Sequence, residues 1–297
     1  MKTAKKIANW TIPPNVYSLL KQTKSEISSR FFMPNEVKKL FNLNKKFKNI
    51  HKGKRCFILA TGPSINKQDL KILQDEICIS VSYFFLHKDI KYINPAYHVE
   101  APNHHPFDFE AFDKIFAGIK KNYTDKTTCF FGYKPYKYSI LDYLKIRKDL
   151  QKDNYCYLDY SQSIQIDERN YDNPNLWDIC KPLFGARTVV YSAINIAAYM
   201  GFSEIYLLGC DHNYLEDYSK QETSHFYDLK DGISDHNDWR KFNTEYLFYT
   251  LYLRWKQYRL IAEYLSAKRC SIYNATAGGC LDVFKRIKLE DIIKNNI

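Results

Sequence analysis

Residues 56–65 read Cys56-Phe-Ile-Leu-Ala-Thr-Gly-Pro-Ser-Ile65, and this stretch decides the fold class. A short apolar strand ends in Thr61-Gly62-Pro63-Ser64, and an amphipathic segment follows over 65–73. Gly62 has no Cβ, so a phosphate or ribose can approach its backbone. Pro63 suits the first turn of a helix, and Ser64 adds a hydroxyl where the helix dipole favours an anion. The stretch predicts the strand, turn and helix that open a nucleotide-binding α/β domain.

Composition narrows the classes of partner. The net charge is +11, from 44 Lys and Arg against 33 Asp and Glu, which favours nucleic acid, an anionic membrane surface or anionic small molecules. No zinc-finger spacing, RNP-like strand or Arg-rich tail accompanies the charge, so we exclude nucleic acid. The 8 Cys form no CxxC pair and are expected to be buried, reduced thiols. No apolar run approaches the ~18 residues of a membrane span, so we expect a cytoplasmic protein, peripheral at most on the inner face of the membrane.

Residues 1–50 differ from the rest and are expected to form a basic, helical N-terminal extension. Many Lys alternate with apolar residues there, and Pro13-Pro14 and Pro34 divide the stretch into two short helical pieces. Such a helix either lies on an anionic membrane surface or packs, solvated, on its own domain. Residues 51–290 are expected to form the Rossmann-like nucleotide-binding catalytic domain.

That domain is expected to be α/β, with a doubly wound, mostly parallel sheet, because strands alternate with helical stretches. Gly201 follows the helical stretch 189–200 and is a natural C-cap. The polar stretch after Asp211 is predicted to be a lid, at about 212–240, because it is long and has no clear periodicity. Strands are expected at 55–60, 77–81, 97–99, 128–131, 205–208 and 270–273, and a second long helix at 246–267.

Ligands of a doubly wound sheet bind where the strands end, so the segments that follow the strands are candidates for one site. They are the Thr61–Ser64 turn, Ser82 after the second strand, Asp211 after a fully apolar strand and Asn274 after the last strand. A carboxylate at the end of such a strand needs a partner, which makes Asp211 a candidate catalytic residue. The alternative is that Asp211 caps a turn through its own side chain.

Further candidates lie outside the strand ends. Arg187 and Thr188 open the helix at 189–200 and form a second place for an anion. His225 and His236 lie in the polar stretch and are candidate general bases, since imidazole titrates near neutral pH. Tyr214 is a candidate hydrogen-bond donor to phosphate. We expect no metal site, because the adjacent histidines at 104–105 do not give a chelating face.

Two motifs carry a resemblance to a known family. Phe57-Ile-Leu-Ala-Thr-Gly-Pro-Ser64 and Gly201-Phe-Ser-Glu-Ile-Tyr-Leu-Leu-Gly-Cys-Asp211 resemble the bacterial CMP-sialic acid sialyltransferases that decorate lipooligosaccharides, over about 52–285. They are similar as well to the MptE-like 6-hydroxymethylpterin diphosphokinase group. The resemblance implies a GT-A-like variant fold, contacts of the Gly-Pro-Ser turn with CMP, and a leaving phosphate held by Tyr214. The general-base His of the sialyltransferases has no aligned counterpart here, and their second-strand Asn is absent.

The resemblance implies a function. It is the metal-independent, inverting transfer of sialic acid or a related acidic sugar from a CMP donor to a hydroxyl of a glycan or glycolipid, as in lipopolysaccharide biosynthesis. No cofactor is expected. One alternative is an ATP-dependent diphosphokinase, whose Mg²⁺ would be held by carboxylates such as Asp211, Glu216 and Asp217. Another is a non-catalytic nucleotide-binding module. A homo-oligomer and an anionic membrane surface are the remaining candidate partners.

Overall fold

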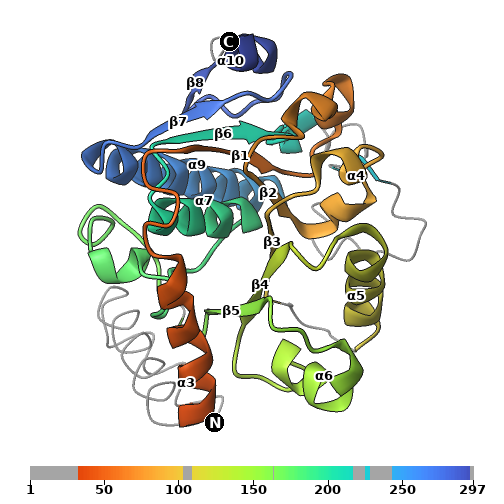
Figure 1. The fold of residues 1–297 in the computed structure, drawn as a ribbon. Coiled ribbons are helices and arrows are strands. Elements are labelled where there is room, and N and C mark those ends of the chain that lie inside the picture. The colour runs from red at the N-terminus through yellow and green to blue at the C-terminus, as the bar shows by residue number, and fades with distance from the viewer. Residues whose placement is uncertain (1–32, 103–108, 163, 217–224, 228–242, 295–297) are drawn as a thin grey trace, which may run out of the picture.

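The structure is a computed structural model, and it describes residues 33–102, 109–162, 164–216, 225–227 and 243–294. One sheet runs through these residues, with helices packed on both of its faces (Figure 1). Its strands are β1 Arg55–Leu59, β2 Cys78–Val81, β3 Tyr97–Glu100, β4 Thr128–Tyr133, β5 Tyr155–Asp159, β6 Glu204–Leu208, β7 Ser271–Asn274 and β8 Lys285–Arg286. The α-helices are α3 Asn35–Asn42, α4 Ile90–Ile93, α5 Glu110–Asn122, α6 Ile140–Ile146, α7 Val189–Met200, α9 Thr244–Ala267 and α10 Leu289–Lys294.

Within the described residues the sheet has 8 strands in the order β5-β4-β3-β2-β1-β6-β7-β8. Every neighbouring pair is parallel. The chain builds outward from β1 to β5, and α7 then carries it back to β6 on the other side of β1. The predicted doubly wound parallel sheet is therefore confirmed. Two strands were missed, β5 and the two-residue, exposed β8.

The side chains of β1 show how the two faces are covered. Cys56 and Ile58 point to the side on which α7 and α9 pack, and both are fully buried. Phe57 and Leu59 point to the opposite side, where they meet α4 and α10. Figure 1 shows α7 and α9 against the same side of the sheet. A strand buried on both faces has to be apolar throughout, which is why β1 and β6 could be recognised in the sequence.

The segment after the Gly-Pro-Ser turn differs from the prediction. It forms two short 3₁₀-helices, η2 Pro63–Lys67 and η3 Leu70–Leu73, instead of one helix over 65–73. Gln68 separates them in an extended conformation (φ −114°, ψ 143°), and its buried side-chain amide donates to the Ala275 carbonyl at 2.9 Å. The predicted helix is wrong, because this long-range contact outweighs the local periodicity. A strong helix dipole at Ser64 therefore does not exist.

Part of the predicted N-terminal extension packs on the sheet. Phe41 of α3 is buried against Tyr133 of β4. In the 3₁₀-helix that follows, η1 Leu43–Phe47, the Asn44 amide donates to the Tyr157 and Ile179 carbonyls. Residues 1–32 lie outside the described residues. In the part of the chain that the structure describes, no helix is long and apolar enough to cross a membrane.

Candidate functional site

The site lies where the chain changes its direction of winding, between β1 and β6. These strands are neighbours in register from Arg55 opposite Glu204 to Leu59 opposite Leu208. The segments that follow β1 and β6 leave the carboxyl ends of these strands toward opposite faces of the sheet. The two turns that follow the strands therefore face each other at this edge. One turn is Thr61–Ser64 and the other begins at Gly209.

Asp211 holds the two turns together. Its Oδ2 accepts a hydrogen bond of 2.9 Å from the Ser64 backbone N–H, and the Gly62 N–H donates to the Gly209 carbonyl at 2.9 Å. The buried carboxylate thus has the partner that its position required, and that partner belongs to the other turn.

The role of Gly62 differs from the expected one. A Cβ at Gly62 would lie 2.1 Å from Asp211 Oδ2 and 2.4 Å from the Gly209 carbonyl oxygen. Gly62 has an ordinary φ of −64°, so its requirement is one of space and not of backbone angle. The absent side chain makes room for the Asp211 carboxylate, whereas the sequence had suggested room for a ligand.

Buried polar atoms at the same turns indicate a place for a ligand. Ser64 Oγ, Asp211 Oδ1 and Asn213 Oδ1 are buried and have no hydrogen-bond partner among the described residues. Leaving such atoms unpaired is costly, so they are commonly satisfied by water or a ligand. Two of them are acceptors only, and Ser64 can both donate and accept. A ligand group that carries O–H or N–H hydrogens fits them.

A short piece of the predicted lid, residues 225–227, sits directly on the first turn. The Phe226 N–H donates to the Thr61 carbonyl at 2.9 Å, and His225 Nδ1 shares a 2.9 Å hydrogen bond with Thr61 Oγ1. The Phe226 ring packs edge-on against His87 and Phe84, with centroids 5.3 and 6.0 Å away. The structure therefore brings two of the predicted site residues, Thr61 and His225, into contact.

Positive charge gathers beside the second turn. Arg254 of α9 is buried, and its guanidinium carbon lies 4.4 Å from the centre of the Tyr214 ring. Desolvation lowers the pKa of Arg187, and the nearby charge of Arg254 lowers it further. Two guanidiniums that repel each other in a partly buried place favour an anion beside them. Arg187 and Tyr214 were predicted; Arg254 was missed, although it is an Arg on the inward face of an aromatic helix.

His212 is the second functional candidate that the sequence did not reveal. Its Nδ1 lies 3.1 Å from the Tyr214 hydroxyl and its Nε2 lies 2.7 Å from the Tyr258 hydroxyl. Desolvation lowers the pKa of His212 to about 3, and Arg254 contributes to the lowering. The ring is therefore neutral at physiological pH. Its backbone has φ +52°, which is uncommon for a residue other than Gly, and no sequence pattern signals it.

Other predicted residues have structural partners. Thr188 caps α7, where its hydroxyl accepts from the Val190 N–H at 3.4 Å. Asn274 is fully buried, with its amide donating to the Leu281 carbonyl and its oxygen accepting from the Thr276 N–H. Ser82 follows β2 with φ +50°, and Pro63 is exposed. His236 and Asp217 lie outside the described residues.

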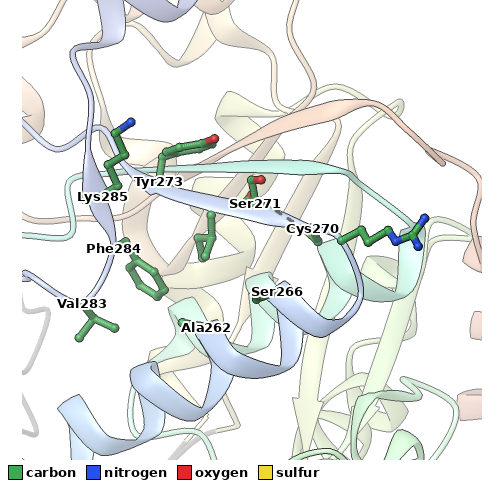
Figure 2. Close-up of a pocket in the computed structure, with 10 residues that line it drawn as sticks. Ala262, Ser266, Cys270, Ser271, Tyr273, Val283, Phe284 and Lys285 are labelled. Atoms are coloured by element: carbon green, nitrogen blue, oxygen red, sulfur yellow. Dashed lines mark hydrogen bonds between the residues drawn. The ribbon is translucent and has the colours of Figure 1, made fainter.

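A cavity of about 460 Å³ lies elsewhere, between α9 and the strands β7 and β8. Figure 2 shows Ala262 and Ser266 on α9 facing the strands, and the side chains of Tyr273 and Lys285 pointing away from that helix. None of the predicted site residues lines it. Among the residues that the structure describes, no three His, Cys, Asp or Glu side chains form a group able to hold a metal ion.

The fold is that of a doubly wound α/β protein, with the candidate site at the turns that follow β1 and β6. A family model described as 6-hydroxymethylpterin diphosphokinase MptE-like matches residues 32–217. The chain belongs to this MptE-like family, as the two sequence motifs indicated. No match was found among curated proteins.

Among solved structures the chain is similar to sialyltransferases. The monofunctional α-2,3-sialyltransferase Cst-I from Campylobacter jejuni is 17% identical, over 80% of this chain and 81% of that one, with a TM-score of 0.47. CstII from Campylobacter jejuni, in complex with a substrate analogue, is 14% identical over 80% and 85%, with a TM-score of 0.43. CST-II with a trisaccharide acceptor and CMP is 15% identical over 79% and 86%, with a TM-score of 0.44.

Proposed function

We propose that the protein transfers sialic acid or a related acidic sugar from a CMP-activated donor to a hydroxyl of a cell-surface glycan or glycolipid. The observation that carries the proposal is the cluster of Arg187, Arg254 and Tyr214 beside the turn that Asp211 joins to Ser64. Such a donor needs both features, because it combines a nucleoside with two anionic groups.

The nucleoside belongs at the joined turns. Asp211 Oδ1 and Asn213 Oδ1 are buried acceptors without a partner in the described residues. Ribose hydroxyls and the exocyclic amino group of cytosine are donors of the kind that these oxygens accept. Ser64 Oγ can either donate to a ribose oxygen or accept from a ribose hydroxyl.

The anionic groups belong at the arginines. Guanidiniums bind carboxylates and phosphates through two parallel hydrogen bonds, which suits both the carboxylate of an acidic sugar and the phosphate of CMP. Negative charge grows on the phosphate as its bond to the sugar breaks. Arg187, Arg254 and the Tyr214 hydroxyl are already in position, so they stabilise that charge without reorganising.

His225 is the proposed general base. If its Nδ1–H donates to Thr61 Oγ1, then Nε2 is the basic nitrogen that takes the proton of the acceptor hydroxyl. The acceptor oxygen then attacks the anomeric carbon, the bond from that carbon to the phosphate oxygen breaks, and CMP leaves with the electron pair. Attack from the side opposite the leaving group inverts the anomeric centre. In this proposal neither a metal nor a cofactor takes part.

Two other functions stay open. The description of the family favours transfer of diphosphate from ATP to a hydroxymethylpterin, a reaction that uses Mg²⁺. The arginines suit that leaving group as well, whereas the buried Asp211 already binds Ser64. A nucleotide-binding module without turnover is the third candidate. The predictions of a cytoplasmic location, of contact with the inner face of the membrane and of a homo-oligomer remain predictions.

The test is calorimetric titration with CMP, CDP, UDP, GDP and ATP, each with and without Mg²⁺, followed by release of CMP from CMP-activated acidic sugars in the presence of glycan acceptors. We expect selective CMP binding that EDTA does not change, and CMP release that depends on the acceptor. His225→Ala should bind CMP normally and lose turnover. Mg²⁺-dependent binding of ATP alone would replace this proposal with the diphosphokinase. CMP binding without turnover of any donor would support the non-catalytic nucleotide-binding module instead.

A further inference from the structure

Three side chains form a hydrogen-bonded row from the core to the site: Tyr258, His212 and Tyr214. Tyr258 lies on α9 and is fully buried, and its hydroxyl is 2.7 Å from His212 Nε2. The opposite nitrogen, Nδ1, is 3.1 Å from the Tyr214 hydroxyl. The imidazole packs edge-on against Tyr258 and Trp255, with centroids 5.3 and 5.8 Å away, so its ring plane is fixed.

A neutral imidazole has one N–H donor and one bare nitrogen that accepts. Burial and the neighbouring Arg254 hold the pKa of His212 far below neutrality, so this neutral form is the one present. The row therefore has a direction. Either Tyr258 donates to the ring and the ring donates to Tyr214, or both bonds run the other way.

The surroundings of Tyr258 decide the direction. Among the described residues the only hydrogen-bond partner of its hydroxyl is His212 Nε2. If Nε2 carried the hydrogen, the fully buried Tyr258 O–H would have no acceptor among them, which is the costlier arrangement. The distances agree, because an O–H donor makes the shorter contact of 2.7 Å and an N–H donor the longer one of 3.1 Å. Nδ1 then carries the hydrogen and donates it to the Tyr214 oxygen.

We infer that His212 is a positioning residue, which occupies the oxygen of Tyr214 and so directs the hydrogen of that hydroxyl to an acceptor on the ligand. The inference rests on the proposed function only for the ligand's identity, which is the departing phosphate of the nucleotide. Arg254, over the face of the Tyr214 ring, strengthens the hydroxyl as a donor, because a positive charge stabilises electron density drawn onto the phenol oxygen. The three side chains thus orient the Tyr214 O–H in advance, so that it donates a hydrogen bond to the leaving phosphate.

The test in the full-length protein compares two amide replacements. In His212→Asn the amide nitrogen takes the place of Nδ1 and keeps a donor for Tyr214; Asn also tolerates the backbone φ of +52°. In His212→Gln the amide reaches the place of Nε2, so the hydrogen bond with Tyr258 is kept and the one with Tyr214 is lost. We expect His212→Gln to lower kcat by about 10- to 100-fold with KM and CMP affinity nearly unchanged, and His212→Asn to retain most of kcat.

A double substitution shows whether His212 acts through Tyr214. Tyr214→Phe should lower kcat by about 100-fold, and adding His212→Gln should lower it no further, because the hydroxyl that His212 directs is already gone. Losses that multiply, or losses confined to KM, would overturn the inference. So would a His212→Asn variant as impaired as His212→Gln, once both have wild-type melting temperatures.

The direction of the row can also be read without turnover. Nitrogen-15 NMR of the His212 ring should show the hydrogen on Nδ1 at pH 7, whereas histidine in water favours Nε2. A hydrogen on Nε2 would overturn the inference whatever the reaction is. A wild-type protein that neither binds nor turns over CMP-sugars would instead remove the proposed function and leave the NMR result standing.

Discussion

The backbone N–H of Ser64 donates to the carboxylate of Asp211 across 2.9 Å, and this one bond ties the turn after β1 to the turn after β6. Both groups are buried, so neither can exchange its partner for bulk water at no cost. The same residues carry Ser64 Oγ and Asp211 Oδ1, which have no hydrogen-bond partner among the described residues. One side of the contact thus joins the two turns, while the other carries the atoms proposed to bind the nucleotide, and variants can separate the two roles.

Gly62→Ala tests the space that the carboxylate needs. The new methyl group would overlap Asp211 Oδ2, so we expect the free energy of unfolding to fall by about 2–3 kcal/mol and CMP binding to be lost. Gly185→Ala is the control, since its Cβ would meet only the Ile164 carbonyl at 3.4 Å. Chemical denaturation measures both variants. Equal stability of Gly62→Ala and Gly185→Ala would show that the turn accommodates the added methyl group, and would contradict this prediction.

Asp211→Ala removes the acceptor of the Ser64 N–H. We expect a loss of about 1–3 kcal/mol in the free energy of unfolding, because a buried donor is left unsatisfied. Asp211→Asn keeps an oxygen for that donor and should lose less stability. Both should weaken CMP binding in calorimetry, because both change the atom that faces the ligand. If Asp211→Ala matched the wild type in stability, the bond would not be holding the turns.

Thr61→Val tests the link between the first turn and His225. The replacement has nearly the same shape and removes only the hydroxyl that His225 Nδ1 contacts. With the imidazole no longer oriented, kcat should fall by about 10- to 100-fold while CMP affinity stays within a few-fold. Thr124→Val, at an exposed position, should leave kcat unchanged. Steady-state CMP release measures both, and an active Thr61→Val would exclude this orienting role.

Arg187→Gln tests the anion site. Losing a charge-assisted hydrogen bond of about 1.5–3 kcal/mol should weaken CMP binding by about 10- to 100-fold. The CMP affinity of Arg187→Lys should lie between those of the wild type and Arg187→Gln, because Lys keeps the charge but cannot form two parallel hydrogen bonds. Arg169→Gln is the control, since Arg169 is exposed and paired with Asp167. Unchanged affinity in Arg187→Gln would place the anion elsewhere.

Acid should destabilise the protein through His212. Its pKa is about 3 when folded, against an ordinary value of 6.5, so between these values the unfolded chain binds more protons. Stability due to this group is complete above pH 6.5 and falls as the pH drops, by at most about 1.4 kcal/mol per unit. Burial lowers the pKa values of His51 and His87 as well, with the same sign. The free energy of unfolding, measured by denaturation across pH 4–8, should therefore change less steeply with pH in His212→Asn than in the wild type. An identical pH dependence would contradict this prediction.

Much of the fold could be predicted because its centre is apolar in long runs. The helix expected at 189–200 is α7 at those bounds, and Gly201 ends it with φ +81° as a C-cap does. Strands β1 and β6 were found for the same reason. In contrast, β8 is two charged residues long, and the helix expected at 65–73 depends on a side-chain contact between Gln68 and a segment far away in the sequence.

The candidate site could be predicted only where one segment of the sequence carries a recognisable pattern. The Gly-Pro-Ser turn and Asp211 follow apolar strands, so their meeting could be anticipated from topology. Arg254 and His212 owe their roles to α9 packing beside the turn after β6, and no local pattern shows which residues of a helix will face a loop. The purpose of Gly62 was misjudged for the same reason, because the carboxylate that needs the space comes from the other turn.

The adjacency of β1 and β6 also sets an order for assembly. During synthesis, β1 through β5 can pair as soon as each emerges, but β1 then waits with one edge open. That edge closes only when β6 has emerged, and the carboxylate that fixes the first turn arrives three residues after it. The β1 strand, whose side chains apart from Arg55 are fully buried in the fold, therefore keeps one edge unpaired until β6 has emerged. The candidate site is completed by the same late strand pairing that covers this edge.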